Sequence, residues 1–205
     1  MIHLYLIRHG QSETNAKPNH IGQSATVDLT DLGVNQSEKL YVRLKNNVKF
    51  DHIYSSPYTR ALHTAKIVCK DYSNIQIAHE LREYSAGDWL GKSRSDIINN
   101  EVKLSMVQLG NAFLPPNGES LSIVQRRASE WLENNIIYKF ANSNDSLHIG
   151  IFSHGMTIKC LLHYIMGFDQ IFTWRISIDN TSISKLIFDD NGWRVITIND
   201  CAHLL

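Results

Sequence analysis

Short apolar segments alternate with amphipathic helical segments through most of the chain, and this alternation restricts the possible folds more than any other feature. Strands are expected at residues 2–7, 50–54, 75–78, 147–152, 182–188 and 193–199. Helices are expected at about 30–46 with Thr30 as N-cap, from Pro57 onward, at about 120–140 and at 156–166. The order predicts an α/β fold with a largely parallel sheet and an antiparallel edge.

The composition is that of a globular chain, and we expect residues 1–205 to form a single domain. Twenty Lys and Arg residues balance twenty Asp and Glu residues, so the formal net charge is zero. We therefore expect no nucleic-acid partner, and any anion site has to be a local cluster. No apolar run reaches the length of about 18 residues that a membrane-spanning helix needs, so no membrane association is expected.

Three widely spaced cysteines, Cys69, Cys160 and Cys201, form no Cys-x-x-Cys pair. We expect them to be buried, reduced thiols, which are typical of a cytoplasmic protein. Arg8 and His9 interrupt the first apolar run before a signal-peptide core could form, which also favours a cytoplasmic location.

Polar side chains follow four of the expected strands at the point where each strand ends. Arg8 and His9 follow the first strand, Arg60 lies one helical turn beyond the second, Glu83 follows the third, and His154 follows the 147–152 strand. Each of these residues by itself is more often structural than catalytic. Because ligands of open α/β sheets bind at the carboxyl ends of the strands, we expect all five to converge in one crevice.

Two arginines and two histidines form a suitable site for a compact dianion such as a phosphoryl group. A guanidinium group binds phosphate oxygens bidentately and stays charged. A neutral imidazole can attack the phosphorus atom while the other basic groups hold the charge, and a carboxylic acid such as Glu83 can protonate the departing oxygen. The pattern predicts phosphoryl transfer through a phosphohistidine, with no metal and no cofactor required.

Three further positions belong to the expected site. Gly155 lets the backbone approach a ligand closely, and the helix beginning near Met156 would direct free N–H groups at the anion. Asn15 adds a neutral amide donor on the loop after the first strand. The expected partner is a small phosphorylated metabolite.

These segments resemble the motifs of the histidine phosphatase superfamily, which includes the phosphoglycerate mutases. The similar segments are 6–15, 55–65, 81–91, 153–158, 180–183 and 199–204. The resemblance implies a three-layer α/β/α sandwich. It also implies that His9 is the phosphorylated nucleophile and Glu83 the proton donor, and that Arg8, Arg60 and His154, helped by Asn15, form the phosphate pocket.

Phosphatases and cofactor-dependent mutases of this family share the phosphohistidine, but a mutase needs extra basic residues to hold a bisphosphate. The segment at about 84–120, expected to be a helical and loop-rich excursion covering the active site, has only Lys92, Arg94 and Lys103 as cations. Arg126-Arg127 follows the Pro-Pro-Asn-Gly-Glu-Ser element and is expected to be a surface pair on the long helix. We therefore predict a metal-independent phosphatase for small phosphomonoesters, similar to the broad-specificity bacterial branch.

Two alternatives stay open. One is a phosphoglycerate mutase, which is an isomerase, and the other is a non-catalytic module that binds a phosphorylated ligand. The sequence also allows either a monomer or a homodimer. The apolar segment 171–174 is expected to belong to the core rather than to an interface.

Overall fold

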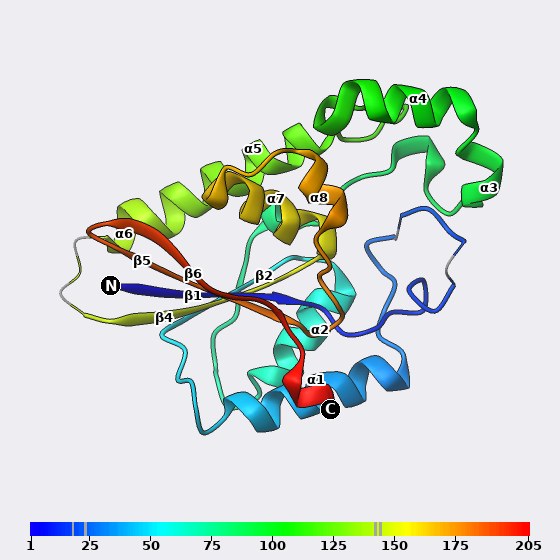
Figure 1. The fold of residues 1–205 in the computed structure, drawn as a ribbon. Coiled ribbons are helices and arrows are strands. Elements are labelled where there is room, and N and C mark those ends of the chain that lie inside the picture. Colours follow the sequence, from blue (N-terminus) through cyan, green and yellow to red (C-terminus); the bar gives the residue numbers. More distant parts are fainter. Residues whose placement is uncertain (18, 23, 142, 144) are drawn as a thin grey trace.

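A single mixed sheet organises the protein. The structure is a computed structural model that describes residues 1–17, 19–22, 24–141, 143 and 145–205, and within these ranges six strands follow the order β3-β2-β4-β1-β5-β6 (Figure 1). The strands are β1 (Ile2–Arg8), β2 (His52–Ser55), β3 (Gln76–Ile77), β4 (Leu147–Ser153), β5 (Ile183–Asp189) and β6 (Gly192–Asp200). Strands β1 to β4 are mutually parallel, β5 pairs antiparallel with β1, and β6 pairs antiparallel with β5. The predicted α/β fold with an antiparallel edge is confirmed.

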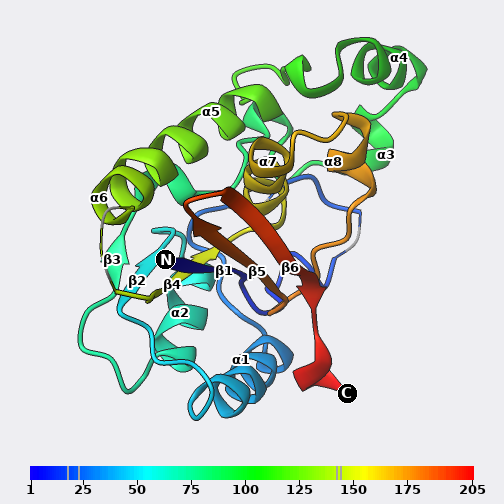
Figure 2. The ribbon, with the colours of Figure 1, turned by 60° about the vertical axis from the view of Figure 1, so that its left-hand side comes forward.

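Helices cover both faces of the sheet. They are α1 (Asp31–Leu44), α2 (Thr59–Val68), α3 (Arg94–Ile97), α4 (Asn100–Leu109), α5 (Leu121–Leu132), α6 (Tyr138–Phe140), α7 (Gly155–Met166) and α8 (Ile171–Arg175). Helices α1 and α2 lie on one face, and α5, α6 and α7 lie on the other (Figure 2). The expected helix over 120–140 is interrupted, because a π-helical turn at Glu133–Ile137 separates α5 from α6.

The alternation of side chains along β1 explains the two covered faces. Leu4 and Leu6 pack into a core with α5 and α7, whereas Tyr5 and Ile7 pack into a second core with α1 and α2. Successive strand residues point to opposite faces of a sheet, so a strand that is apolar at every position needs a layer on each side. The three-layer α/β/α arrangement follows.

The segment between β3 and α5 stands to one side of the sheet. It contains α3 and α4 together with short 3₁₀ turns, and both helices lie well away from the strands (Figure 1). Several apolar side chains of α4 and its flanking turns are solvent-exposed, as at Leu104 and Val107, whereas Leu81 and Ala86 nearer β3 are buried. None of the helices in the described ranges is long and apolar enough to cross a bilayer.

Helix α8 corrects the expectation that segment 171–174 belongs to the core. Thr173 is buried, but Ile171, Phe172 and Trp174 are each close to half exposed. This five-residue helix lies at the rim, next to the end of α7, so one of its faces packs against the fold and the other does not (Figure 1).

The cysteines match expectation in two positions of three. Cys69 and Cys160 are buried free thiols, and burial raises the pKa of each to about 12. Cys201 is also a free thiol but is only partly buried, because it follows β6 near the chain end.

Candidate active site

The two candidate histidines lie side by side because their strands are neighbours. Strands β1 and β4 pair in parallel with Arg8 opposite Ser153, so His9 and His154 leave the sheet at the same edge. Their ring centroids are 5.2 Å apart, and both side chains are almost completely buried. The expected convergence of the strand ends is therefore seen for this pair.

The hydrogen bonds of His9 define which ring nitrogen is available for chemistry. Its Nδ1 lies 2.6 Å from the carbonyl oxygen of Gly10, and since a carbonyl only accepts, Nδ1 donates. The lone pair is then on Nε2, where it accepts a hydrogen bond from Nε of Arg60 at 3.2 Å. Burial, with the positive charges of Arg60 and Arg8, holds the pKa of His9 well below 6.5. His9 is thus a neutral imidazole whose Nε2 faces the basic cluster.

The basic groups around His9 have unused hydrogen-bonding capacity. Arg60 is fully buried and donates from Nη1 to the carbonyl of Ser24 at 2.8 Å, and Arg8 donates from Nη1 to the carbonyl of Ile178 at 2.6 Å. Nε of Arg8, Nη2 of Arg60 and Nδ1 of His154 are buried and have no hydrogen-bond partner among the described residues. Buried polar groups are normally paired. The two guanidinium nitrogens are donors that an anion would satisfy, and Nδ1 of His154 joins them in the tautomer whose Nε2 accepts from Oγ of Ser56.

The protonation states also suit an anion site. Burial lowers the pKa of the Arg60 guanidinium to about 10, so the group is still charged at neutral pH. Burial and the charge of Arg60 hold the pKa of His154 well below 6.5. The Nε2 atom of His154 lies 2.7 Å from Oγ of Ser56. The centre thus combines two cationic guanidinium groups with two neutral imidazoles.

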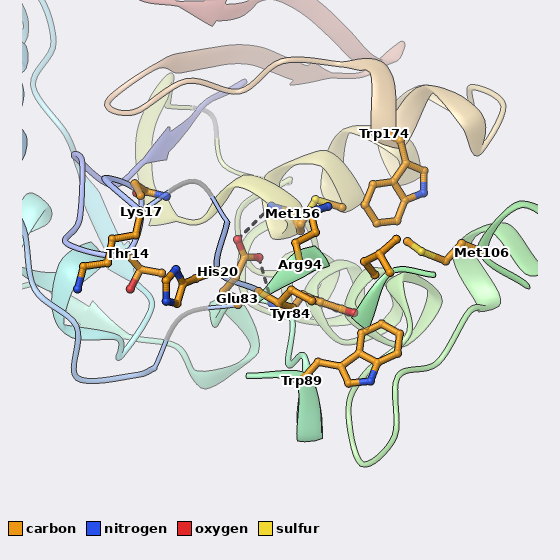
Figure 3. A pocket seen from close by; sticks show the side chains of 14 residues that line it. Thr14, Lys17, His20, Glu83, Tyr84, Trp89, Arg94, Met106, Met156 and Trp174 are labelled. Carbon is orange, nitrogen blue, oxygen red and sulfur yellow. Dashed lines mark hydrogen bonds between the residues drawn. The ribbon is translucent and has the colours of Figure 1, made fainter. Parts of the chain in front are cut away.

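The carboxylate of Glu83 is held by the first turn of α7. It accepts hydrogen bonds from the backbone N–H groups of Met156 at 3.2 Å and Tyr84 at 3.0 Å (Figure 3). It also accepts from the backbone N–H of Thr157 at 3.2 Å. The free N–H groups at this helix start were expected to face the anion directly. That expectation is wrong for the N–H groups of Met156 and Thr157, because the carboxyl group of Glu83 already accepts from both of them.

Gly155 and Asn15, the remaining expected positions, lie beside the cluster formed by Arg8, His9, Arg60 and His154. Gly155 is next to Arg8, and a Cβ atom added there would lie 3.5 Å from the Arg8 Nε atom. Asn15 accepts through Oδ1 from the hydroxyl of Ser12 at 3.0 Å and from Nδ2 of Asn180 at 3.3 Å.

A cavity of about 390 Å³ adjoins Glu83. Lys17 and His20 lie toward one end of it, and Trp89, Met106 and Trp174 lie toward the other, with Glu83 between them (Figure 3). Asn15 and Met156 also line the cavity, whereas the buried His9, Arg60 and His154 do not. A group bound in the cavity would therefore reach the basic centre past Glu83.

Several residues of the site were not predicted from the sequence. Ser56 contacts His154, Thr64 accepts from the N–H of Gly10 at 3.0 Å, and Asn180 donates to the carbonyl of His9 at 3.0 Å. Asn180 and Ser56 belong to segments that resembled family motifs, so their positions were a usable signal. Thr64, which faces the loop after β1 from α2, also lies in one of these segments, 55–65.

The expectation for Arg126-Arg127 is only half right. Arg126 is exposed, as predicted for a surface pair. The side chain of Arg127 is only 12% exposed and forms an ion pair with Glu119, with Nε 2.9 Å from a carboxylate oxygen. Arg127 does not line the cavity.

Comparison with known proteins decides the family. Residues 4–201 match the sequence model of the histidine phosphatase superfamily (branch 1). The chain belongs to this superfamily. The resemblance of the sequence motifs is thereby confirmed.

Relatives of this histidine phosphatase superfamily member include phosphatases and mutases. It is 30% identical to "Putative phosphoserine phosphatase 2" of Hydrogenobacter thermophilus, over 99% of this chain and 98% of the other. It is 29% identical to "Probable phosphoglycerate mutase GpmB" of Yersinia pestis (strain Pestoides F), over 100% and 95%. A phosphoserine phosphatase from Entamoeba histolytica, solved with phosphoserine, superimposes with a TM-score of 0.85 at 25% identity, covering both chains fully. The superfamily and the fold support an enzyme.

Proposed function

We propose that the protein is a metal-independent phosphomonoesterase that works through a phosphohistidine on Nε2 of His9. The observation that carries this proposal is the tautomer of His9. The carbonyl of Gly10 holds the ring proton on Nδ1, and the lone pair of Nε2 points toward Arg60 within a cluster of unpaired buried donors. A neutral nucleophile and preorganised cationic donors are the two requirements of this chemistry.

The first half-reaction transfers the phosphoryl group to the enzyme. Nε2 of His9 attacks the phosphorus, and the bond from phosphorus to the alcohol oxygen breaks. Arg8, Arg60 and His154 donate to the phosphoryl oxygens, and Arg60 exchanges its hydrogen bond to Nε2 for one to the bound anion. Glu83, in its acid form, donates a proton to the departing oxygen, which leaves as the alcohol.

The second half-reaction restores the enzyme. The Glu83 carboxylate accepts a proton from a water molecule as the water oxygen attacks the phosphorus. The bond between phosphorus and Nε2 breaks, inorganic phosphate leaves, and His9 returns to the neutral imidazole. Glu83 regains the proton that it donated in the first half-reaction, so one turnover consumes one water molecule.

Small phosphorylated metabolites are the proposed substrates, with the alcohol part in the cavity beside Glu83. The cations that line this cavity are Lys17, His20 when protonated, and Arg94. Arg127 is committed to Glu119, so it is not available to hold the second phosphate of a bisphosphate. The distribution of charge therefore favours hydrolysis over the phosphoglycerate mutase activity suggested by the name of one relative.

Phosphorus NMR tests the proposal directly. The purified protein is mixed in excess chelator with a panel of 3-phosphoglycerate, phosphoserine, glycerol 2-phosphate and ethyl phosphate, with and without 2,3-bisphosphoglycerate. Inorganic phosphate should grow without the bisphosphate, and His9→Ala should abolish its growth. Formation of 2-phosphoglycerate only in the presence of the bisphosphate would instead establish a mutase. Binding of the esters without any turnover would point to a binding module.

A further inference from the structure

We propose that Arg127 and Glu119 form a positioning pair. The pair fixes the backbone around the proton-donor residue Glu83 and thereby the position of its carboxyl group beside Arg8, His9, Arg60 and His154. The inference rests on the proposed function. It assigns a role to the Pro-Pro-Asn-Gly-Glu-Ser element and to one arginine of the Arg126-Arg127 pair, neither of which contacts the phosphoryl site.

The pair is buried and bidentate. Nε of Arg127 donates to Oε1 of Glu119 at 2.9 Å, and Nη2 donates to Oε2 at 3.0 Å. The two side chains are only 12% and 11% exposed. Arg82 adds a third donor, from Nη2 to Oε1 of Glu119 at 3.0 Å. Planar fork-to-fork pairing fixes the relative orientation of the two groups as well as their distance.

The pair contacts the backbone of residues 80–85, which we call the Glu83 strap. Arg127 donates from Nη1 to the carbonyl of Glu80 and from Nη2 to the carbonyl of Glu83 at 3.3 Å. Oε2 of Glu119 accepts from the N–H of Ser85 at 3.1 Å, and the backbone N–H of Glu119 donates to the carbonyl of Ser85 at 2.9 Å. The pair thus fixes the main chain at Glu83 itself and on both sides of it.

The strap depends on these contacts because β3 ends at Ile77, and residues 80–85, all of which the structure describes, pair with no strand of the sheet. The carbonyls of Leu81 and Arg82, between those that Arg127 binds, also accept from side chains. Oγ of Ser153 donates to the carbonyl of Leu81 at 2.7 Å, and Oγ1 of Thr157 donates to that of Arg82 at 2.8 Å. Four consecutive carbonyls, those of residues 80–83, are therefore held by side chains. Arg127 donates to the first and the last of these four carbonyls, so it fixes both ends of this part of the strap.

Burial would favour the neutral form of Glu119, but the hydrogen bond and charge of Arg127 prevail and hold the pKa of Glu119 below its usual value. Glu119 is therefore ionised at neutral pH, and its charge-assisted hydrogen bonds with Arg127 hold both side chains in place. The side chain of Glu83 is fixed separately by the first turn of α7. Without Arg127 the backbone of Glu83 would be free to shift, and the side chain would have to change its conformation to keep its hydrogen bonds to α7. The carboxyl group would then be misplaced relative to the departing oxygen, so proton donation would be the first step to slow.

Leaving-group dependence separates this role from general support of the fold. The value of kcat/KM covers the steps up to departure of the alcohol, so it does not include hydrolysis of the phosphohistidine. An alkyl alcohol needs protonation to leave, whereas p-nitrophenolate does not. A misplaced Glu83 therefore lowers kcat/KM for alkyl esters and spares p-nitrophenyl phosphate, whereas a damaged phosphate pocket lowers both equally.

The experiment measures the ratio of kcat/KM for the fastest alkyl ester of the NMR panel to that for p-nitrophenyl phosphate. Arg127→Met should lower this ratio at least tenfold, and the matched control Arg126→Met should change it less than twofold. Once Glu83→Gln has removed the proton donor, adding Arg127→Met should change the ratio less than twofold. If Arg127→Met does not fold, Arg127→Lys is used; it keeps the charge without the fork, and a drop of threefold or more is expected.

Two outcomes would overturn the inference. One is an unchanged ratio in Arg127→Met, or in Arg127→Lys if Arg127→Met does not fold, whether or not both esters lose activity equally. The other is a further drop in the ratio when Arg127→Met is added to Glu83→Gln. In each of them the wild type cleaves the esters and the proposed function stands. Absence of turnover of both esters by the wild type would overturn the proposed function, and this inference with it.

Discussion

At the residue scale, the centre is defined by which groups are charged and which are neutral. Arg60 contacts the ring nitrogen of His9 that has the lone pair, and it is fully buried. Its guanidinium can therefore serve the nucleophile before the reaction and the phosphoryl oxygens during it. A planar fork is needed for this exchange, because one edge must release Nε2 while another already contacts the anion.

Replacement of Arg60 by Lys should lower kcat/KM by about 10²–10³-fold, the usual cost of removing one preorganised donor from a transition-state site. The ammonium group retains a charge but lacks the planar fork that lets the guanidinium keep its bond to the carbonyl of Ser24 while it exchanges Nε2 of His9 for phosphoryl oxygens. Steady-state kinetics with p-nitrophenyl phosphate provides the measurement, and circular dichroism checks the fold. Activity within threefold of the wild type would show that charge alone is sufficient.

Glu83→Gln should lower kcat/KM for alkyl phosphates by about 10²–10⁴-fold, the range for loss of a general acid, and for p-nitrophenyl phosphate by less than tenfold. The Gln amide oxygen can take the Oε1 position and still accept from Thr157 and Tyr84, so the side chain keeps two of its three contacts, and only the contact with the N–H of Met156 is lost. Glu80→Gln, three residues earlier on the same strap, is the control and should change neither value. Equal losses on both ester classes would argue against Glu83 as the proton donor.

At the element scale, the parallel pairing of β1 with β4 explains why much of the site could be predicted from the sequence. Parallel strands end at a common edge, so residues directly after each strand converge whatever the helices do. The predicted convergence of His9 and His154 needed only the strand positions. The Glu119–Arg127 pair could not be found in this way, because it depends on how the 84–120 segment folds back onto α5.

Trp174 was predicted wrongly to lie in the core for a similar reason. An apolar residue in a short helix at the rim has no periodic pattern that separates core from surface.

Helix α1 supports the loop after His9 by close backbone contact as well as by side chains, since Oε1 of Gln36 accepts from the N–H of Gln11 at 2.9 Å. Gly33 lies in the first turn of α1, and a Cβ atom at this position would lie 2.0 Å from the carbonyl oxygen of Gln11. Thr30 caps the same turn, accepting from the N–H of Gly33 at 3.1 Å, as predicted, and its own N–H donates to the carbonyl of Gln11 at 2.9 Å. The loop and the helix are therefore in direct contact.

Gly33→Ala should destabilise the protein by about 1–3 kcal/mol, the typical cost of overpacking, although Gly→Ala inside a helix usually stabilises. The loop has to move to accept the methyl group, so the activity should fall as well. Urea denaturation gives the free energy of unfolding, with Asn35→Ala at an exposed position of α1 as the control that should not lose stability. A stability equal to or above that of the wild type would show that the loop yields without cost.

At the scale of the whole molecule, the site lowers the stability of the protein in acid. Two buried histidines are held neutral in the folded state, next to buried guanidinium groups. In the unfolded chain the same side chains titrate near 6.5. Below that pH the unfolded state binds more protons than the folded state, so the free energy of unfolding falls as the pH falls. Polar groups that the chemistry requires are thus kept at the expense of stability.

This linkage should make the buried histidines the main cause of acid destabilisation just below neutral pH. Between pH 6 and 5 most carboxylates stay ionised, so histidines dominate the change, and His154 should contribute a loss of about 1.4 kcal/mol per pH unit. His154→Gln removes one titrating group, and its free energy of unfolding should therefore fall less steeply than that of the wild type by this amount. Urea denaturation at closely spaced pH values measures both slopes, and His79→Gln, at a position outside the site, is the control. Parallel slopes for His154→Gln and the wild type would mean that His154 takes up its proton without unfolding, and the neutral pair at the centre of the proposed mechanism would then have to be abandoned.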